Sequence, residues 1–221
     1  MEHTDLSGSH RDPAYFLFWP VFVLRYLLVE NWNPAALYHP VRCAADDRIP
    51  FLELFLIPYV LWYICLAGVH IWLYRRRDPS FRMYTWYLMI TMSISTAVFL
   101  LYPTCQELRL EVFPRDNLLT DAVKLLYRMD TNTNVCPSEH VIGSAGFFLA
   151  VCYAEGVGCR QNRLAAVAAI LTGSATVFLK QHSLVDVLPA LPVCVIGWFA
   201  AFLSVWKPGN VTHPLYRQDW G

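Results

Sequence analysis

The 221-residue sequence has little charge. Asp, Glu, Lys and Arg make up 15% of it, against about 25% in an average soluble domain. Basic and acidic residues balance at 17 each, so the formal net charge is zero. The basic residues are scattered or border apolar segments, and we expect no nucleic-acid partner. Bulk charge therefore indicates no particular partner.

The sequence also lacks the cysteine spacing of a metal or redox site. None of its seven cysteines forms a Cys-x-x-Cys pair or a zinc-type pattern with histidine. A disulfide among Cys43, Cys105 and Cys136 is left open, and the other cysteines are expected to be buried apolar side chains. We also expect no cleavable signal peptide, because the first dozen residues are polar and no convincing small-residue cleavage site follows.

What the sequence has in quantity is apolar residues, which make up 56% of the chain. Runs of about 20 such residues have the length of a membrane-spanning helix, and in lipid every backbone group must be paired internally. We therefore predict an all-α fold: a six-helix transmembrane bundle forming a single integral membrane domain over 1–221. Its core is expected at about 83–206, with tails at 1–13 and 207–221. The predicted spans are 14–29, 51–74, 83–102, 137–154, 164–179 and 184–206.

Lysine and arginine set the predicted orientation. Arg75, Arg76, Arg77 and Arg82 follow the second span, and further basic residues lie between the fourth and fifth spans and in both tails. Six spans put all of these on one side, which we assign to the cytoplasm. The sequence thus predicts a multi-pass protein of the plasma or cell membrane with both termini cytoplasmic.

The loop between the third and fourth spans contains a further predicted element. Residues 117–128 combine spaced leucines with charged residues, which predicts a short amphipathic helix on the membrane surface. Two roles are equally compatible with the sequence: it covers the mouth of the bundle, or it touches a lipid substrate.

Two short motifs lie at the mouths of apolar spans. Cys136-Pro137-Ser138-Glu139-His140 opens the fourth span, and Lys180-Gln181-His182-Ser183-Leu184-Val185-Asp186 joins the fifth to the sixth. A charged residue deep in such a span costs about 2.5–3.5 kcal/mol on insertion scales, so it needs a reason. The chain enters with one span and returns with the next. His140 and His182 are therefore expected on the same, extracytoplasmic face.

The residue types in these motifs suit phosphoryl chemistry. His182 and Asp186 are four residues apart on one helical face, and a carboxylate that accepts the Nδ1 proton leaves Nε2 as nucleophile or base. Pro137 and Ser138 open a helix whose free N–H groups can cradle an anion. His140, in the same turn, can pass a proton to a leaving oxygen.

These residues resemble the type-2 phosphatidic acid phosphatase superfamily, which shares its core with vanadium-dependent haloperoxidases. Its motifs are K-x6-R-P, P-S-G-H and S-R-x5-H-x3-D. Residues 137–140 match the second motif at three of four positions, and His182 with Asp186 matches the end of the third. The resemblance covers the third to sixth spans. It is closest to branches with inositol-phosphotransferase-like and bacterial lipid phosphatase members.

Several positions depart from the family pattern. Arg109 is taken as the arginine of the first motif, but Leu110 replaces its proline and Tyr102 its lysine. Ala175 and Thr176 replace Ser and Arg of the third motif, and Lys180 is the candidate replacement cation. Glu139 replaces a glycine of the second motif. Its carboxylate must point away, pair with an arginine or serve a substrate hydroxyl.

The resemblance implies a metal-independent phosphohydrolase that removes phosphate from a membrane lipid phosphate or pyrophosphate without a cofactor. It implies that His182 attacks phosphorus, Asp186 orients it and His140 moves the proton. The expected partners are the bilayer and the phosphorylated lipid. The residues expected around the phosphate are Arg109, Arg115, Arg128, Ser138, Glu139 and Lys180.

Three other functions stay open. A transferase could pass a phosphorylated head group to a lipid alcohol, as a phosphorylceramide synthase does. A non-catalytic lipid-binding protein could retain a decayed site. A metal site could use His140, His182, Asp186 and Glu139, although the neighbouring cations disfavour it.

Overall fold

The computed structural model describes residues 13–31 and 37–205, and this part of the chain is mostly helical. The predicted tails, 1–13 and 207–221, lie outside it except for Pro13. The described helices are α1 (Phe18–Asn31), α2 (Leu56–Arg76), α3 (Ser80–Leu101), α4 (Leu118–Met129), α5 (Glu139–Tyr153), α6 (Cys159–Phe178) and α7 (Leu184–Val205). The short elements are the 3₁₀ turns η2 (Pro13–Leu17), η3 (Asp46–Arg48) and η4 (Glu53–Phe55) and the strands β1 (His39–Pro40) and β2 (Thr104–Cys105).

Four helical segments are long and apolar enough to cross a membrane: Pro13–Glu30, Glu53–Arg76, Ser80–Leu101 and Leu184–Leu203. α5 is apolar but has only 15 residues, and α6 is not among the four. The helical fold is therefore confirmed and membrane-spanning lengths are present, whereas the predicted count of six spans is not confirmed.

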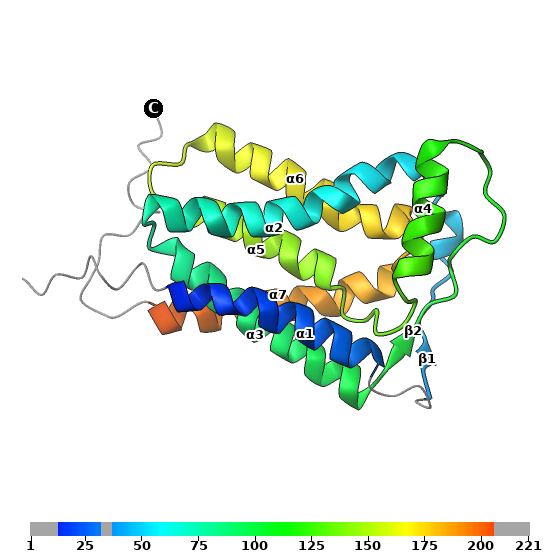
Figure 1. Ribbon diagram of the computed structural model, residues 1–221, viewed down its shortest axis with the longest axis horizontal. Coiled ribbons are helices and arrows are strands. Elements are labelled where there is room, and N and C mark those ends of the chain that lie inside the picture. Colours follow the sequence, from blue (N-terminus) through cyan, green and yellow to red (C-terminus); the bar gives the residue numbers. More distant parts are fainter. Residues whose placement is uncertain (1–12, 32–36, 206–221) are drawn as a thin grey trace, which may run out of the picture.

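The long helices run along the long axis of the molecule, and α4 crosses them at one end, which is also the end where β1 and β2 lie (Figure 1). α3 packs closely on α7, and α5 on α6. Close approach of α3 and α7 depends on Gly197, where an added Cβ would lie 2.2 Å from Cγ2 of Thr91. Small residues at such crossings are the usual means of packing helices in a membrane.

α4 confirms the helix predicted at 117–128. It begins after Asn117, whose side-chain oxygen accepts a hydrogen bond from Thr120 N at 3.0 Å and caps the helix. Val123 points inward and is fully buried in a small cluster with Phe51, Tyr59 and Leu179. α4 therefore closes one end of the bundle over α2 and α6.

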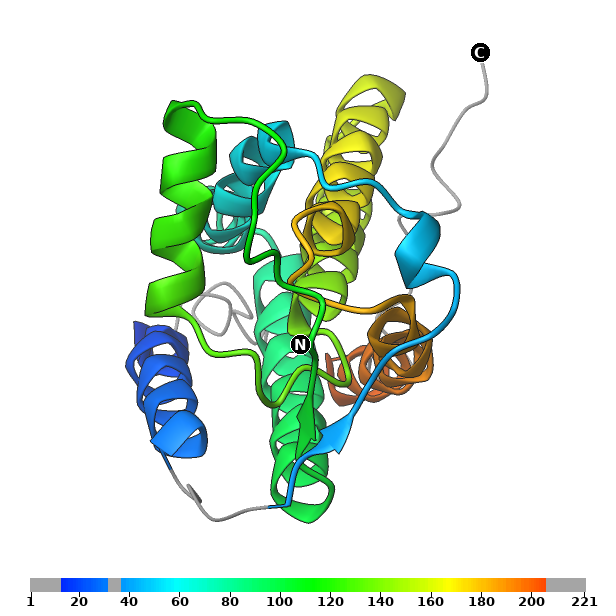
Figure 2. The ribbon, with the colours of Figure 1, turned by 90° about the vertical axis from the view of Figure 1, so that its right-hand side faces the viewer.

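The loops beside α4 gather at the same end of the molecule as the α6–α7 turn and the start of α5 (Figure 2). β1 and β2 form a parallel two-stranded pair that joins the loop after α1 to the loop after α3. All seven cysteines are free thiols, so hydrogen bonds rather than disulfides hold these loops.

Candidate active site

The two motifs meet where α5 and α7 begin. Ser138 N donates a hydrogen bond to the Asp186 carbonyl at 3.0 Å, which ties the start of α5 to the first turn of α7. The imidazole rings of His140 and His182 then lie with their centroids 5.8 Å apart. His140, His182 and Asp186, the three residues predicted to be catalytic, therefore lie close together.

His182 and Asp186 form a buried pair. The His182 Nδ1 lies 3.3 Å from Asp186 Oδ2, and the same oxygen accepts a hydrogen bond from Ser183 N at 2.8 Å. Asp186 is completely buried. Since a carboxylate only accepts hydrogen bonds, the proton of a neutral His182 belongs on Nδ1. This arrangement leaves Nε2 of His182 with its lone pair.

Two aromatic residues of α2 hold His140. The imidazole stacks on Tyr59 at 4.6 Å and lies 4.3 Å from Trp62, measured between ring centroids. Trp62 Nε1 also donates to the His140 carbonyl at 2.9 Å. Tyr59 and Trp62 thus form an aromatic wall beside His140. This wall could not be predicted, because nothing in the α2 sequence distinguishes these two aromatics from lipid-facing ones.

Three buried polar atoms around the histidines have no hydrogen-bond partner within the described chain: Ser138 Oγ, His140 Nε2 and Asp186 Oδ1. Leaving such a group unpaired costs about 1–3 kcal/mol. The first hydrogen bond of α5 runs from Ile142 N to the Ser138 carbonyl, so the N–H groups of residues 139–141 precede the helical ladder. The site therefore presents donors and acceptors for a polar ligand.

Glu139 is held by Arg25 of α1. The guanidinium binds both carboxylate oxygens, at 2.6 and 2.7 Å, and also donates to the Met92 carbonyl at 3.1 Å and to Thr96 Oγ1 at 2.9 Å. Of the three roles left open for Glu139, the structure shows pairing with an arginine. A lone charge at position 25 of an apolar span is the sequence signal that could have indicated a buried partner for Arg25.

Arg109 lies beside the site but is already engaged. Its guanidinium donates to Gln181 Oε1 at 2.9 Å and to the carbonyls of Tyr127, Asp130 and Thr131 at 2.9, 2.8 and 2.5 Å. Burial lowers the pKa of this guanidinium, while nearby Asp130 opposes the shift. Arg109 thus fixes Gln181, the neighbour of His182, to the segment after α4.

The three remaining predicted cations are Lys180, Arg115 and Arg128, and none of them makes a hydrogen bond or ion pair with His140, His182 or Asp186 among the described residues. Lys180, which adopts φ 56°, donates from Nζ to the carbonyls of Asp46 and Ile49 at 2.7 and 2.6 Å, and burial lowers its pKa. Arg115 pairs with Glu53 at 3.0 Å. Arg128 is exposed in the last turn of α4 and makes no hydrogen bond or ion pair with the described residues. Three of the four predicted cations, Arg109, Lys180 and Arg115, therefore already donate hydrogen bonds to oxygen atoms of the protein.

Asp46 holds the turn that follows His182, and it was not among the residues predicted from the sequence. Its carboxylate accepts hydrogen bonds from Ser183 Oγ, Leu184 N and Cys43 N at 2.6, 2.9 and 2.8 Å. Burial raises the pKa of this carboxyl, but these hydrogen bonds outweigh it and the pKa lies below its ordinary value. Asp46 thus caps α7 directly after His182.

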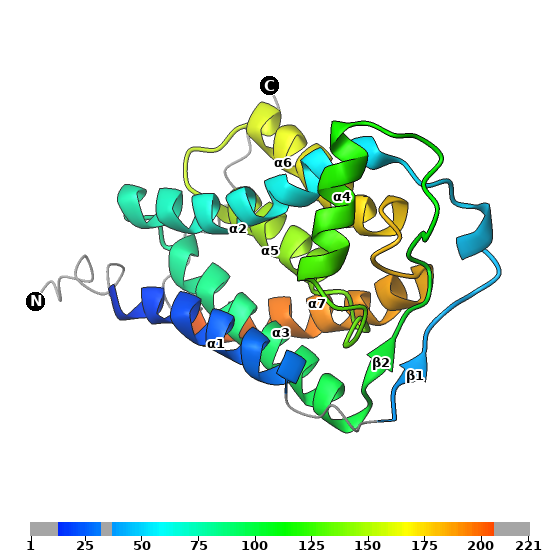
Figure 3. The same cartoon turned by 45° about the vertical axis from the view of Figure 1, so that its right-hand side comes forward.

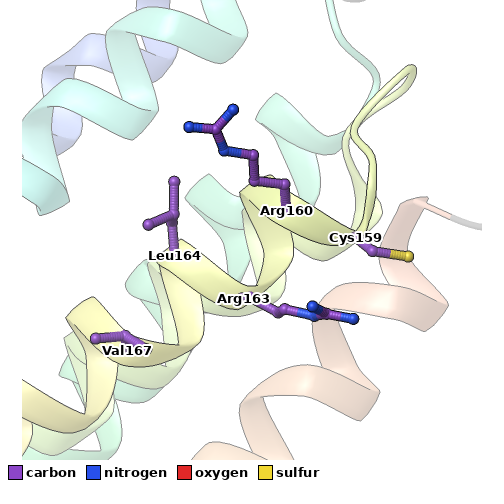
Figure 4. A pocket seen from close by; sticks show the side chains of 5 residues that line it. All are labelled: Cys159, Arg160, Arg163, Leu164 and Val167. Atoms are coloured by element: carbon purple, nitrogen blue, oxygen red, sulfur yellow. The ribbon is translucent and has the colours of Figure 1, made fainter.

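No group of three or more His, Cys, Asp or Glu side chains could hold a metal ion within residues 13–31 and 37–205. A surface pocket lies at the start of α6, where Cys159, Arg160 and Arg163 line it with Leu164 and Val167 (Figure 4). His182 follows the other end of this 20-residue helix, about 30 Å away at 1.5 Å per residue. The pocket is therefore separate from the histidine site.

Comparisons with protein-family models, with curated proteins and with solved structures found no match to this chain. The resemblance to the type-2 phosphatidic acid phosphatase superfamily therefore depends on residues 137–140, His182 and Asp186. The geometry of these residues is the basis for any functional conclusion.

Proposed function

We propose that this protein is a membrane enzyme that removes phosphate from a lipid phosphate or pyrophosphate through a phosphohistidine on His182. One observation carries the proposal. Asp186 orients His182, whose ring centroid lies 5.8 Å from that of His140, beside buried polar atoms that have no hydrogen-bond partner among the described residues. This is the arrangement that an activated nucleophile and a proton carrier require.

The membrane arrangement belongs to the same proposal. We take α5 and α6 as the spans that complete a six-helix bundle with the four long apolar segments. Both termini are then cytoplasmic, and the histidine site faces the other side. The arginines near the α2–α3 and α5–α6 connections support this orientation through the positive-inside rule.

The proposed reaction has two displacement steps. Nε2 of His182 attacks phosphorus, the bond from phosphorus to the lipid oxygen breaks, and His140 gives that oxygen a proton. His140 then takes a proton from water as the water oxygen attacks the phosphohistidine, which releases phosphate and restores His182. Asp186 keeps the proton on Nδ1 and stabilises the positive charge that develops on the ring.

Backbone groups carry much of the phosphate binding in this mechanism. The Ser138 hydroxyl and the N–H groups of residues 139–141 form a donor set at the start of α5, where the helix dipole favours an anion. Arg109 and Lys180 support the loops instead, because carbonyl oxygens occupy their donors. Arg128 is the predicted phosphate cation whose guanidinium makes no hydrogen bond or ion pair with residues 13–31 and 37–205.

Phosphate release from purified protein tests the proposal. The substrates are phosphatidic acid and a polyprenyl pyrophosphate, each with a chelator present. We expect wild type to release phosphate and His182→Ala and His140→Ala to lose activity. His39→Ala is the matched control, because His39 of β1 stacks on Tyr102, which directly follows α3, and neither residue contacts His140 or His182. Activity that survives in His182→Ala, or an alkali-stable phosphoryl label on that variant, would reject the mechanism.

A transferase would use the same intermediate with a lipid hydroxyl in place of water. Glu139 was the residue that hinted at a hydroxyl partner, and Arg25 occupies both of its oxygens. We therefore favour hydrolysis. A new phospholipid formed from an added lipid alcohol, in place of free phosphate, would select transfer.

A non-catalytic lipid-binding role is the second candidate. The observation in its favour is the engagement of Arg109 and Lys180 by protein carbonyls. Vanadate, which mimics pentacoordinate phosphorus, separates the two functions. Saturable vanadate binding that is lost in His182→Ala supports the enzyme, and its absence from wild type supports the non-catalytic role.

A further inference from the structure

Helices α1 and α2 meet at one end and diverge towards the other. At the meeting point, Trp19 Nε1 donates to His70 Nδ1 at 2.9 Å, and the rings of Phe16 and Tyr74 lie 4.9 Å apart. From there the two helices separate towards the histidine site, in both Figure 1 and Figure 3. α1 and α2 form two sides of a triangle of helices whose third side is α4, and we call this triangle the frame.

α4 forms the third side. At its start, Asn117 Nδ2 donates to Glu53 Oε1 at 3.0 Å, where α2 is about to begin. At its end, Asp130 Oδ1 accepts from the hydroxyl of Tyr26 on α1 at 2.8 Å. α4 therefore bridges the separated ends of α1 and α2, and Figure 3 shows the start of α5 behind this frame.

Tyr63 of α2 stands inside the frame. It follows helical spacing with His70 and Tyr74, seven and eleven residues on, so it lies on the flank of α2 that faces α1. Its side chain is 51% exposed, yet its ring centroid is 4.9 Å from Trp62 and 6.1 Å from His140. Tyr63 thus contacts both the surroundings and the wall of the active site.

The α1 side of the frame is held by polar contacts. Phe18, near the meeting point, is the one buried residue among the described side chains of α1. Towards the site, α1 is attached through Arg25 to Glu139, through Tyr26 to Asp130 and through Glu30 to Thr131. Among the described side chains of this half of α1 none is fully buried, so polar contacts rather than a buried apolar core hold it in place.

The geometry points to a lateral entrance: a hydrocarbon chain of the lipid phosphate passes between α1 and α2, beneath α4, and lies beside Tyr63 and His140. The inference rests on the proposed function for the phosphate group. The occupant follows from the sides of the frame. The segments Pro13–Glu30 and Glu53–Arg76, which contain α1 and α2, are long and apolar enough to cross a membrane, so the exposed Tyr63 between them would adjoin hydrocarbon. Exposed Leu118, Leu125 and Met129 continue the apolar surface along α4.

Photolabelling of the full chain in phosphatidylcholine nanodiscs tests the entrance. The probe is phosphatidic acid with a diazirine in one acyl chain. We expect labelled peptides from 20–30 and 57–67, with labelling competed by unlabelled phosphatidic acid and not by added phosphatidylcholine. Tyr63→Trp, which fills the frame, should reduce the competed labelling. Leu61→Trp, on the opposite flank of α2, should leave it unchanged. Labelling that phosphatidic acid does not compete would overturn the entrance.

Turnover separates this inference from the proposed function. Tyr63→Trp should slow release from long-chain phosphatidic acid by about tenfold, as overpacking of about 1.4 kcal/mol implies, and spare a water-soluble aryl phosphate. Equal rates for Tyr63→Trp and Leu61→Trp on the lipid would overturn the entrance and leave the phosphatase intact. Competed labelling without phosphate release from any substrate would reject the phosphatase and retain the entrance.

Discussion

Arg25 of α1 grips both carboxylate oxygens of Glu139, the residue that directly precedes His140, with nitrogen–oxygen distances of 2.6 and 2.7 Å. The two side chains are only 16% and 15% exposed. A charge that would be costly within an apolar span is thus neutralised by a charge on the first turn of α5. The ion pair fixes α1 to α5, the helix that carries His140.

Removing one partner of this pair should destabilise the protein. We expect Arg25→Met or Glu139→Met to lower the free energy of unfolding by about 2–3 kcal/mol, because a poorly solvated charge loses its partner. The double variant should lose less than the sum of the single losses. Unfolding in mixed detergent micelles measures all three. Strictly additive losses would show that the pair contributes no coupling.

Asp186→Asn should impair turnover without unfolding the site. Asparagine can donate a hydrogen bond to Nδ1, which selects the wrong tautomer of His182 and protonates Nε2. We expect kcat for phosphate release to fall by about 10²–10⁴-fold. Initial rates with phosphatidic acid measure the change, and thermal unfolding checks the fold. A rate within twofold of wild type would contradict the orienting role.

The Asp46 carboxylate makes stability depend on acid. Its pKa in the folded state is below the ordinary value, so it stabilises the fold above about pH 4, its unfolded pKa, and this stabilisation is lost as pH falls through the folded pKa. Asp46→Asn should cost about 1–3 kcal/mol at pH 7. The difference from wild type should shrink at pH 3.

Asp47→Asn is the matched control for this experiment. Asp47 pairs with Arg42 where the two side chains are 59% and 55% exposed, so its removal should cost about 0–1 kcal/mol. Equilibrium unfolding at pH 7 and pH 3 gives the comparison. A constant difference between wild type and Asp46→Asn at both pH values would contradict a lowered pKa at Asp46.

Gly143→Ala should disturb His140 through Trp62. An added Cβ at position 143 would lie 2.6 Å from Cζ2 of Trp62, the indole that packs against His140. We expect a loss of about 1–3 kcal/mol from overpacking, together with slower phosphate release. Gly68→Ala is the control, since nothing lies within 4 Å of its added Cβ and alanine favours a helix. Equal stability and equal rates of phosphate release in the two variants would argue against a role for Trp62 in positioning His140.

Much of the helical fold and the meeting of His140 with His182 could be predicted from the sequence. Apolar runs located the long helices, the spaced leucines located α4, and a chain that returns after each span placed His140 beside His182. The predicted count of spans exceeded what length and composition support, because α5 is short and α6 is insufficiently apolar. Hydropathy alone does not decide whether such helices cross a bilayer.

The supporting residues could not be predicted, because they lie far from the motifs in the sequence. Asp46 caps α7 from 137 residues away, and Arg25 reaches Glu139 across 114 residues. Side-chain spacing within one helix carries no information about such pairs. Lys180 was expected at the phosphate, but its left-handed backbone and the carbonyls of the 46–49 turn direct its ammonium elsewhere.

The aromatic wall of Tyr59 and Trp62 beside His140 comes from the earlier part of the chain, whereas His140 itself comes from the later part. Every residue of the two motifs follows Arg77, whereas the aromatic wall, the Asp46 cap and the Arg25 clamp all precede it. In the proposed mechanism the later part supplies the reacting groups, and the earlier part shapes the space around them. If the protein is a lipid phosphatase, changes of lipid preference among its variants should collect in the first eighty residues, while loss of phosphate release should collect after them.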